Sequence, residues 1–143
     1  MHTLIDYVYN EATHSYSVTI GTDIGQFSGT VTCRPEDYQF EATYFGYEMA
    51  ERKALIKYAR AKRDYYTAQI EALARFWREM SATRTYDPTA FWVKKIKLRL
   101  DELAEDRDMW IHKIAAMKQS YRYAIEQTDK VNAIRRRKES VHD

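Results

Sequence analysis

The sequence predicts an α+β fold, in which an N-terminal antiparallel β-hairpin or small sheet is followed by two long antiparallel α-helices. Near the N-terminus apolar residues alternate with polar ones, which is typical of strands. Two later segments carry apolar residues at spacings of three and four, the period of a helix. A short break containing Pro88 separates these segments. With 143 residues the chain has the size of one domain, so residues 1–143 are expected to form a single domain.

The strands are expected within about residues 14–45. From Tyr16 to Cys33 the chain reads "YSVTIGTDIGQFSGTVTC", with alternating apolar residues on both sides of "GTDIG". Asp23 and Gly25 suit a hairpin turn, because such loops favour polar residues and positive φ angles. The segment "RPED" should end the second strand, and "FEATYF" should add a short third one. A hairpin alone is unstable in water, so its apolar face must cover a helix or a second copy of the chain.

The first helix is expected over about residues 47–80, a stretch without Gly or Pro. At 1.5 Å per residue it would be about 50 Å long. Its apolar positions recur at helical spacing and are Ala50, Ala54, Tyr58, Ala61, Tyr65, Ala68, Ala72, Phe76 and Met80.

The second helix is expected over about residues 88–134. Asp87 can cap its N-terminus, and Pro88 suits the first turn, where no backbone N–H is needed. Residues 135–143 form a polar tail that is expected to fray. The seam of this helix is heptad-like and contains Ile96, Leu100, Leu103, Arg107, Trp110, Ile114, Met117 and Tyr121.

Two helices of this length cannot bury all their apolar surface against each other and one small sheet, because the surface is large for the enclosed volume. We therefore expect a homo-oligomer, either a dimer or an assembly of dimers. Large apolar residues spread over more than one helical face support this expectation: Trp77, Phe91, Trp92, Met109, Trp110, Tyr121 and Tyr123.

Charge and cysteine content exclude several classes of function. The net charge is +2, from 23 basic and 21 acidic side chains, so no overall field favours DNA or an anionic membrane. No window approaches the about 20 apolar residues of a membrane helix, and the first residues do not resemble a signal peptide. Cys33, the single cysteine, excludes an internal disulfide and is expected to be a buried apolar residue in a reducing compartment. We expect neither DNA nor a membrane as a partner.

The residues that carry catalysis or bind metals show no pattern here. The four histidines lie in different segments, and none sits four residues from another, as metal-binding helices commonly place them. The carboxylates of the second helix alternate with Lys and Arg, which is typical of a solvated face. The sequence therefore predicts a protein that is not an enzyme and that has no catalytic residues, metal site or cofactor.

Aromatic and basic residues gather around the break between the helices. Rings stack on nucleobases, and arginines and helix N-termini bind phosphates. A ligand site here is one interpretation, and the alternative is that the rings only pack the tip of the helical hairpin. The candidate residues at the break are Phe76, Trp77, Arg84, Tyr86 and Asp87, followed by the aromatic and basic residues Phe91, Trp92, Lys94, Lys95 and Arg99.

Arg107 is unusual because it occupies a seam position between Leu100 and Ile114. A buried arginine is costly unless it meets a carboxylate, a phosphate or water. The two interpretations are an ion pair with an acid of a neighbouring chain and a bound anion. Arg122 flanks the seam at Tyr121 and could face the same cavity.

The chain resembles a known family in the order and spacing of its segments. A short hairpin ends in "VTCRPED", "FGYEMAERKALIKY" opens a long helix, and a break of the form "RTYDPTAF" precedes a second long helix. The chain is in this respect similar to the phage-encoded anti-Thoeris proteins of the first described type, which are sponges that sequester isomers of cyclic ADP-ribose.

The resemblance implies a viral anti-defence protein in the host cytoplasm. Such a protein binds a cyclic ADP-ribose-type signalling nucleotide without cleaving it and so blocks bacterial immune signalling. Some members also sequester cyclic trinucleotides at separate sites between subunits. The family's ligand contacts are aromatic residues and arginines, so the resemblance favours Phe76 and Arg107 as contacts, then Arg84, Tyr86, Asp87 and Arg122.

Two other functions remain open from the sequence. The long helices could instead form a phage inhibitor that binds a defence protein or a nucleoprotein complex directly. The "RRRK" run near the C-terminus suits this alternative, although four basic residues are weak evidence for nucleic acid. The chain could also be a component of a virion or a coiled-coil assembly.

Overall fold

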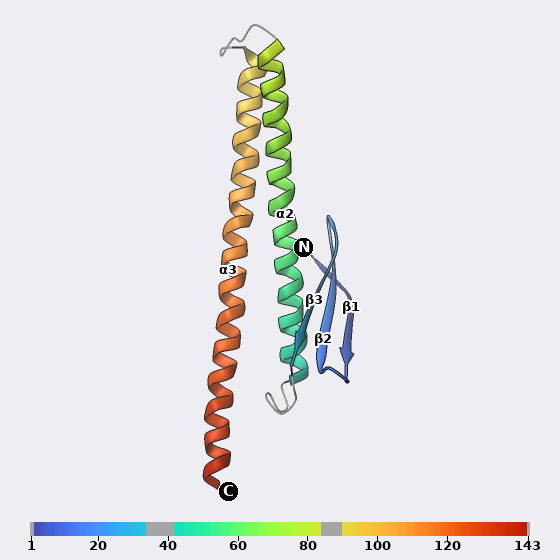
Figure 1. Ribbon diagram of the computed structural model, residues 1–143, viewed down its shortest axis with the longest axis vertical. Coiled ribbons are helices and arrows are strands. Elements are labelled where there is room, and N and C mark those ends of the chain that lie inside the picture. Colours follow the sequence, from blue (N-terminus) through green and yellow to red (C-terminus); the bar gives the residue numbers. More distant parts are fainter. Residues whose placement is uncertain (1, 34–41, 84–89, 143) are drawn as a thin grey trace. The chain divides into compact units, whose positions relative to one another are not determined.

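The structure is a computed structural model, and it describes residues 2–33, 42–83 and 90–142. Three strands, β1 (Thr3–Asn10), β2 (Ser15–Thr22) and β3 (Gly25–Thr32), precede two helices, α2 (Ala42–Thr83) and α3 (Phe91–His142) (Figure 1). The predicted α+β arrangement is confirmed. The chain divides into two compact units, one formed by Met1–Tyr58 with Ala115–Asp143 and the other by Ala59–Ile114.

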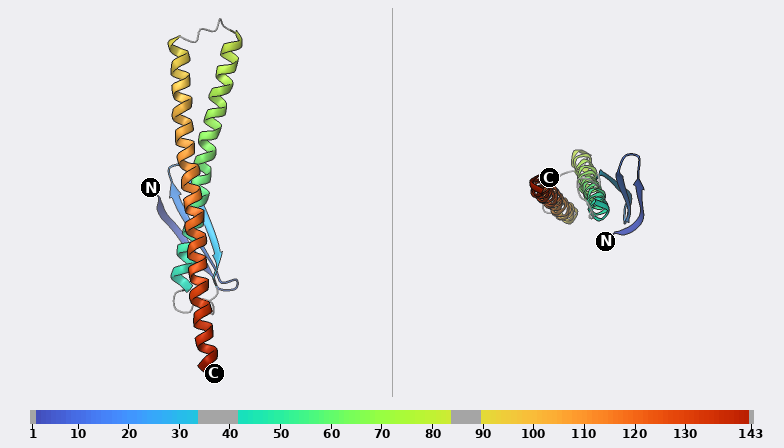
Figure 2. Two further views of the ribbon diagram at one scale, coloured as in Figure 1. Left: turned by 90° about the vertical axis from the view of Figure 1, so that its left-hand side faces the viewer. Right: turned by 90° about the horizontal axis from the view of Figure 1, so that it is seen from below.

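The sheet of the first unit is antiparallel, with strand order β1-β2-β3 (Figure 2). The predicted hairpin is confirmed as β2 and β3, in which Thr22 pairs with Gly25 across a two-residue turn. Gly25 has a φ angle of 130°, a conformation that favours glycine. On one face of the sheet, hydroxyl groups pair across the strands, with Ser17 Oγ 2.8 Å from Thr30 Oγ1.

The third strand was predicted at the wrong end of the hairpin. It is Thr3–Asn10, whereas residues 42–45 of the predicted strand "FEATYF" belong to α2. Packing explains the difference, because Met49 and Ala50 in the same helix are 2% and 0% exposed. Tertiary burial therefore overrides the strand preference of the aromatic residues. The alternation of apolar and polar residues does not identify β1, because this strand has apolar residues on both faces.

The core of the first unit lies between the sheet and the N-terminal part of α2. Tyr16, Val18 and Ile20 of β2 alternate inward and are almost fully buried. Cys33 is buried as predicted, and its backbone N–H donates to the carbonyl of His14 at 2.9 Å. Gly46 permits close packing, since a Cβ atom there would lie 2.6 Å from Cγ of Tyr16.

Residues of α3 also belong to this first unit. Arg52 Nη1 of α2 donates to Ser120 Oγ of α3 at 3.0 Å, and the ammonium of Lys53 lies 5.9 Å from the centre of the Tyr121 ring. Burial raises the pKa of Tyr121. The helix α3 continues to His142, so residues 135–142 are helical where the sequence predicted a polar tail. Lys, Arg and Glu are good helix formers, and they extend the helix through this polar stretch.

The second unit consists of the parts of α2 and α3 on either side of the break. Val93, Leu103 and Ile114 are its most buried α3 residues, at 0%, 3% and 5% exposure, and the last two lie on the predicted seam. Two cations lie near the ring of Trp110, with Lys62 Nζ 5.9 Å and Lys113 Nζ 4.5 Å from its centre. Across the described residues, neither helix contains a stretch apolar enough to cross a membrane.

Candidate functional site

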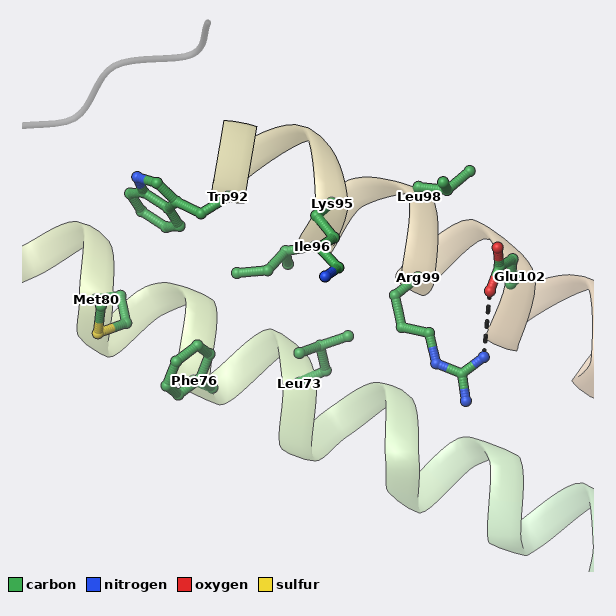
Figure 3. A pocket seen from close by; sticks show the side chains of 9 residues that line it. All are labelled: Leu73, Phe76, Met80, Trp92, Lys95, Ile96, Leu98, Arg99 and Glu102. Atoms are coloured by element: carbon green, nitrogen blue, oxygen red, sulfur yellow. Dashed lines mark hydrogen bonds and ion pairs between the residues drawn. The ribbon is translucent and has the colours of Figure 1, made fainter. Parts of the chain in front are cut away.

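A cavity of about 640 Å³ lies between α2 and α3 in the second unit (Figure 3). Pockets that bind small molecules commonly measure about 300–1,000 Å³. Nine residues line the cavity: Leu73, Phe76, Met80, Trp92, Lys95, Ile96, Leu98, Arg99 and Glu102. The cavity is therefore large enough to hold a nucleotide.

The α2 wall of the cavity is entirely apolar. Leu73, Phe76 and Met80 are spaced by three and four residues, so the helix presents them on one face. Figure 3 shows Leu73 reaching toward α3, with the Phe76 ring and Met80 lying along α2 beside it. The side chain of Phe76 remains 48% exposed, so its ring can still be covered by a ligand. This wall offers a surface for a flat apolar or aromatic group.

The charged groups of the cavity all come from α3. They are Lys95, Arg99 and Glu102, at helical spacings of four and three. Arg99 Nη1 lies 3.2 Å from Glu102 Oε2, and the two side chains are 58% and 51% exposed. An ion pair this exposed contributes little to stability, so an anionic ligand could displace Glu102 from Arg99 at small cost. The Lys95 ammonium lies 5.9 Å from the centre of the Phe91 ring.

Trp92, which lines the cavity, packs against Trp77 of α2. The rings of Trp77 and Trp92 are 5.6 Å apart at an angle of 46°, so α2 and α3 are in contact at this end of the second unit. Ser81 Oγ donates a hydrogen bond of 2.8 Å to the carbonyl of Trp77 one turn earlier. The Trp77–Trp92 contact holds Trp92 at the edge of the cavity.

The candidate residues predicted from the sequence are only partly brought together. Phe76 lines the cavity. Trp77 does not line it, but its ring packs against the ring of Trp92, which does. Arg84, Tyr86 and Asp87 lie outside the described residues. Arg107 and Arg122 do not line this cavity, and they are treated separately below.

Arg107 lies on the predicted seam of α3 and is half-buried in the structure. Its side chain is 33% exposed, and Nη2 lies 3.4 Å from Oδ1 of Asp108. The prediction that Arg107 binds a phosphate or an acid of a neighbouring chain therefore stays a prediction. Arg122 is exposed and belongs to the first unit, so nothing places it with the cavity residues.

Other cavity residues could have been found from the sequence. Met80 and Ile96 were already on the predicted apolar faces, and Lys95 and Arg99 were among the cations noted near the break. Leu73, Leu98 and Glu102 were missed as cavity residues. Helical spacing could have indicated two of them, since Leu73 lies three residues before Phe76 and Glu102 lies three residues after Arg99.

Chemically, the cavity combines an apolar wall with two cations on the facing helix. It can accept a molecule with a flat ring at one part and an anionic group at another. In the part of the chain that the structure describes, no cluster of three His, Cys, Asp or Glu residues could hold a metal ion. No protein-family model matches the chain, and neither the curated proteins nor the solved structures contain a significant match.

Proposed function

We propose that the protein is a viral anti-defence protein that binds and sequesters a cyclic ADP-ribose-type signalling nucleotide without cleaving it. Sequestration in the host cytoplasm would keep the signal from its effector and block bacterial immune signalling. The proposal includes a cyclic trinucleotide as a second ligand, because it also carries bases and phosphates. In keeping with the resemblance, the proposal includes a homo-oligomer.

The observation that carries this proposal is the cavity between α2 and α3. Its volume of about 640 Å³ suits a nucleotide. The exposed ring of Phe76 provides a stacking surface for the base, and Arg99 and Lys95 can each donate charge-assisted hydrogen bonds to phosphate. Segment order and spacing in the sequence point independently to signal-binding sponges.

Recovery of the ligand tests whether binding occurs without cleavage. Incubation with cyclic ADP-ribose isomers, removal of unbound ligand and heat denaturation are expected to release the intact isomer, as measured by mass spectrometry. Before denaturation, the same ligand should raise the melting temperature, since a ligand that binds the native state stabilises it by mass action. Release of a cleaved product, or no stabilisation by any isomer, would contradict the proposal.

Glu102→Gln is expected to tighten binding of an anionic nucleotide. The substitution removes a carboxylate that lies 3.2 Å from Arg99 and repels phosphate. Because both groups are exposed, the gain should be about two- to fivefold in Kd, and it should shrink as salt is added. Isothermal titration calorimetry at two salt concentrations measures both effects.

The matched control for this variant is Glu105→Gln. Glu105 is exposed on the same helix, and its replacement changes the net charge by the same amount without altering the cavity. It is expected to leave Kd within measurement error. Equal tightening by both variants would mean that overall charge, and not the pair with Arg99, controls binding.

One observation favours the alternative, a helical inhibitor that binds a defence protein directly. Phe91 and Leu98 on α3 are 78% and 60% exposed, and such residues often lie in protein interfaces. If the protein has this alternative function, no nucleotide is expected to raise its melting temperature. The thermal measurement described above therefore separates the two functions.

A further inference from the structure

A second cavity, of about 330 Å³, lies between the sheet and α2 within the first unit. The described residues that line it are Leu4, Tyr7 and Val18 of the sheet and Tyr47, Glu48 and Glu51 of α2. Among these residues are two aromatic rings and two carboxylates but no basic side chain, whereas the cavity of the second unit contains Lys95 and Arg99. The two cavities therefore suit ligands of opposite charge.

A β-bulge in β1 forms the sheet wall of this second cavity. Residues three apart in a regular strand point to opposite faces of the sheet. The register of β1 shifts between Leu4 and Asp6, which places Leu4 opposite Ile20. Tyr7 lies opposite Val18, and both Val18 and Ile20 are buried in the core. The bulge therefore turns Leu4 and Tyr7 to the same inward face, and bulges commonly re-aim side chains in this way next to active sites.

The inward face of β1 is open to solvent, but its aromatic ring is held in place. Val18 is 2% exposed, whereas Leu4 and Tyr7 on the same face are 55% and 59% exposed. The ring of Tyr7 meets the ring of Tyr47 edge to face, with centres 5.1 Å apart. The ring of Tyr47 meets buried Tyr16 in the same way, at 4.9 Å. Rings that are already ordered lower the entropy cost of binding a ligand.

Glu48 and Glu51 give the second cavity its charge. Glu48 Oε1 accepts a hydrogen bond from Arg52 Nη2 at 2.9 Å, and Glu51 Oε1 lies 3.0 Å from His2 Nε2. The two glutamate side chains are 37% and 42% exposed, so these pairs are weak and a competing cation can displace them. Both contacts use Oε1, and each carboxylate has a second oxygen that can accept a hydrogen bond from a ligand.

We propose that the second cavity binds a small aliphatic diamine in its doubly protonated form. Side chains three residues apart on a helix have Cβ atoms about 5–6 Å apart, so two ammonium groups joined by a short alkyl chain can each meet one carboxylate. The Tyr7 ring attracts an ammonium group through its π face, and Leu4 and Val18 contact the methylene groups. This ligand is unrelated to a nucleotide, so the inference goes beyond the proposed function.

The walls of the second cavity favour a diamine over a metal ion. Calcium and magnesium ions take about six or more oxygen ligands and gain nothing from apolar walls. The described lining supplies two carboxylates, and its other residues are apolar or aromatic. An alkyl chain that carries a positive charge at each end matches both kinds of wall.

Titration with putrescine, a four-carbon diamine, tests the class of ligand. Isothermal titration calorimetry of the full chain at low salt is expected to give a Kd about three- to fivefold lower for putrescine than for butylamine, which has the same alkyl chain and one ammonium group. The second ammonium group causes this difference, so the difference should shrink when salt is added. Absence of putrescine binding, or equal affinity for the two amines, would overturn the proposal.

Glu51→Gln tests the carboxylates. The substitution is expected to raise the Kd of putrescine about three- to fivefold, because it removes one of the two carboxylates of the cavity. The matched control is Glu71→Gln, an exposed residue of α2 outside the cavity, whose replacement changes the net charge by the same amount. The control should leave the Kd unchanged. Equal weakening by both variants would show that overall charge controls binding and would overturn the proposal.

Two variants of Tyr7 test the ring. Tyr7→Leu is expected to raise the Kd of putrescine about two- to fivefold through loss of the cation–π contact, whereas Tyr7→Phe keeps the ring and should bind like the parent. Tyr7 is 59% exposed, so both variants should keep the circular dichroism of the parent. Unchanged binding by Tyr7→Leu would overturn the proposal. Tyr7 and Glu51 do not line the first cavity, so failure of these tests would leave the proposed nucleotide binding untouched.

Discussion

Replacing Gly29 with valine is expected to destabilise the first unit by at least about 3 kcal/mol. A Cβ atom at Gly29 would collide with the carbonyl oxygen of Ala50 and would lie 2.7 Å from the backbone nitrogen of Ala54. These are backbone atoms of α2, so no side-chain rotation can relieve the contact. The change should appear as a lower denaturation midpoint in circular dichroism.

The control for Gly29→Val is Thr32→Val on the same strand. Thr32 is exposed, and valine keeps its β-branched shape, so the free energy of unfolding should change by no more than about 0.5 kcal/mol. If the two variants unfold at the same denaturant concentration, α2 does not approach β3 as closely as the structure has it.

Phe76→Ala is expected to weaken nucleotide binding roughly ten- to hundredfold. The ring is the exposed aromatic group on the apolar wall of the cavity, and loss of base stacking costs about 1–3 kcal/mol per base. The fold should be preserved, because the Phe76 side chain is 48% exposed. Titration calorimetry gives the change in Kd, and circular dichroism checks the helices.

Tyr65→Ala provides the comparison for this variant. Tyr65 lies on the same helix in the same unit, is 49% exposed and is not a cavity residue. Its replacement should leave the nucleotide Kd unchanged. If both variants weaken binding equally, or neither does, Phe76 is not the stacking residue, and the proposed site must lie elsewhere.

The sheet shows how much of this fold local sequence specifies. Alternation from Tyr16 onward and the turn residues Asp23 and Gly25 predict β2 and β3 correctly, because their period and turn chemistry act within a few residues. The strand β1 has apolar residues on both faces, so its period is blurred. Its pairing with β2 is as local as that of β3, so the blurred period and not the range of the contacts hides it, and the observed register, such as Tyr9 with Tyr16, identifies it.

The lysines of α2 illustrate a second limit of sequence reasoning. A lysine on a charged helix is usually solvated, and nothing local distinguishes Lys53 and Lys57 from their neighbours. In the structure, each donates to a backbone carbonyl of β3. Their role depends on which sheet edge the helix covers, and this contact joins residues more than 20 positions apart in the chain.

The candidate site was found only in part for the same reason. Rings and cations near the break pointed to Phe76 and Trp77, and to Lys95 and Arg99, because residue type is visible in the sequence. The heptad pattern also indicated Arg107, which does not line this cavity and lies 3.4 Å from Asp108 Oδ1. Which side chains line one cavity depends on the relative rotation of two helices, and that rotation is a property of packing.

The sequence by itself determined the α+β class, the hairpin of β2 and β3, and the existence of two long helices. These features follow from periodicity, turn residues and the positions of Gly and Pro, all of which act locally. The tertiary structure alone decided that Thr3–Asn10 is the open edge and that Gly29 lies against α2. It also decided that the cavity has an apolar α2 wall and a charged α3 wall. These depend on contacts between distant segments, which form where burial of apolar surface outweighs local preference.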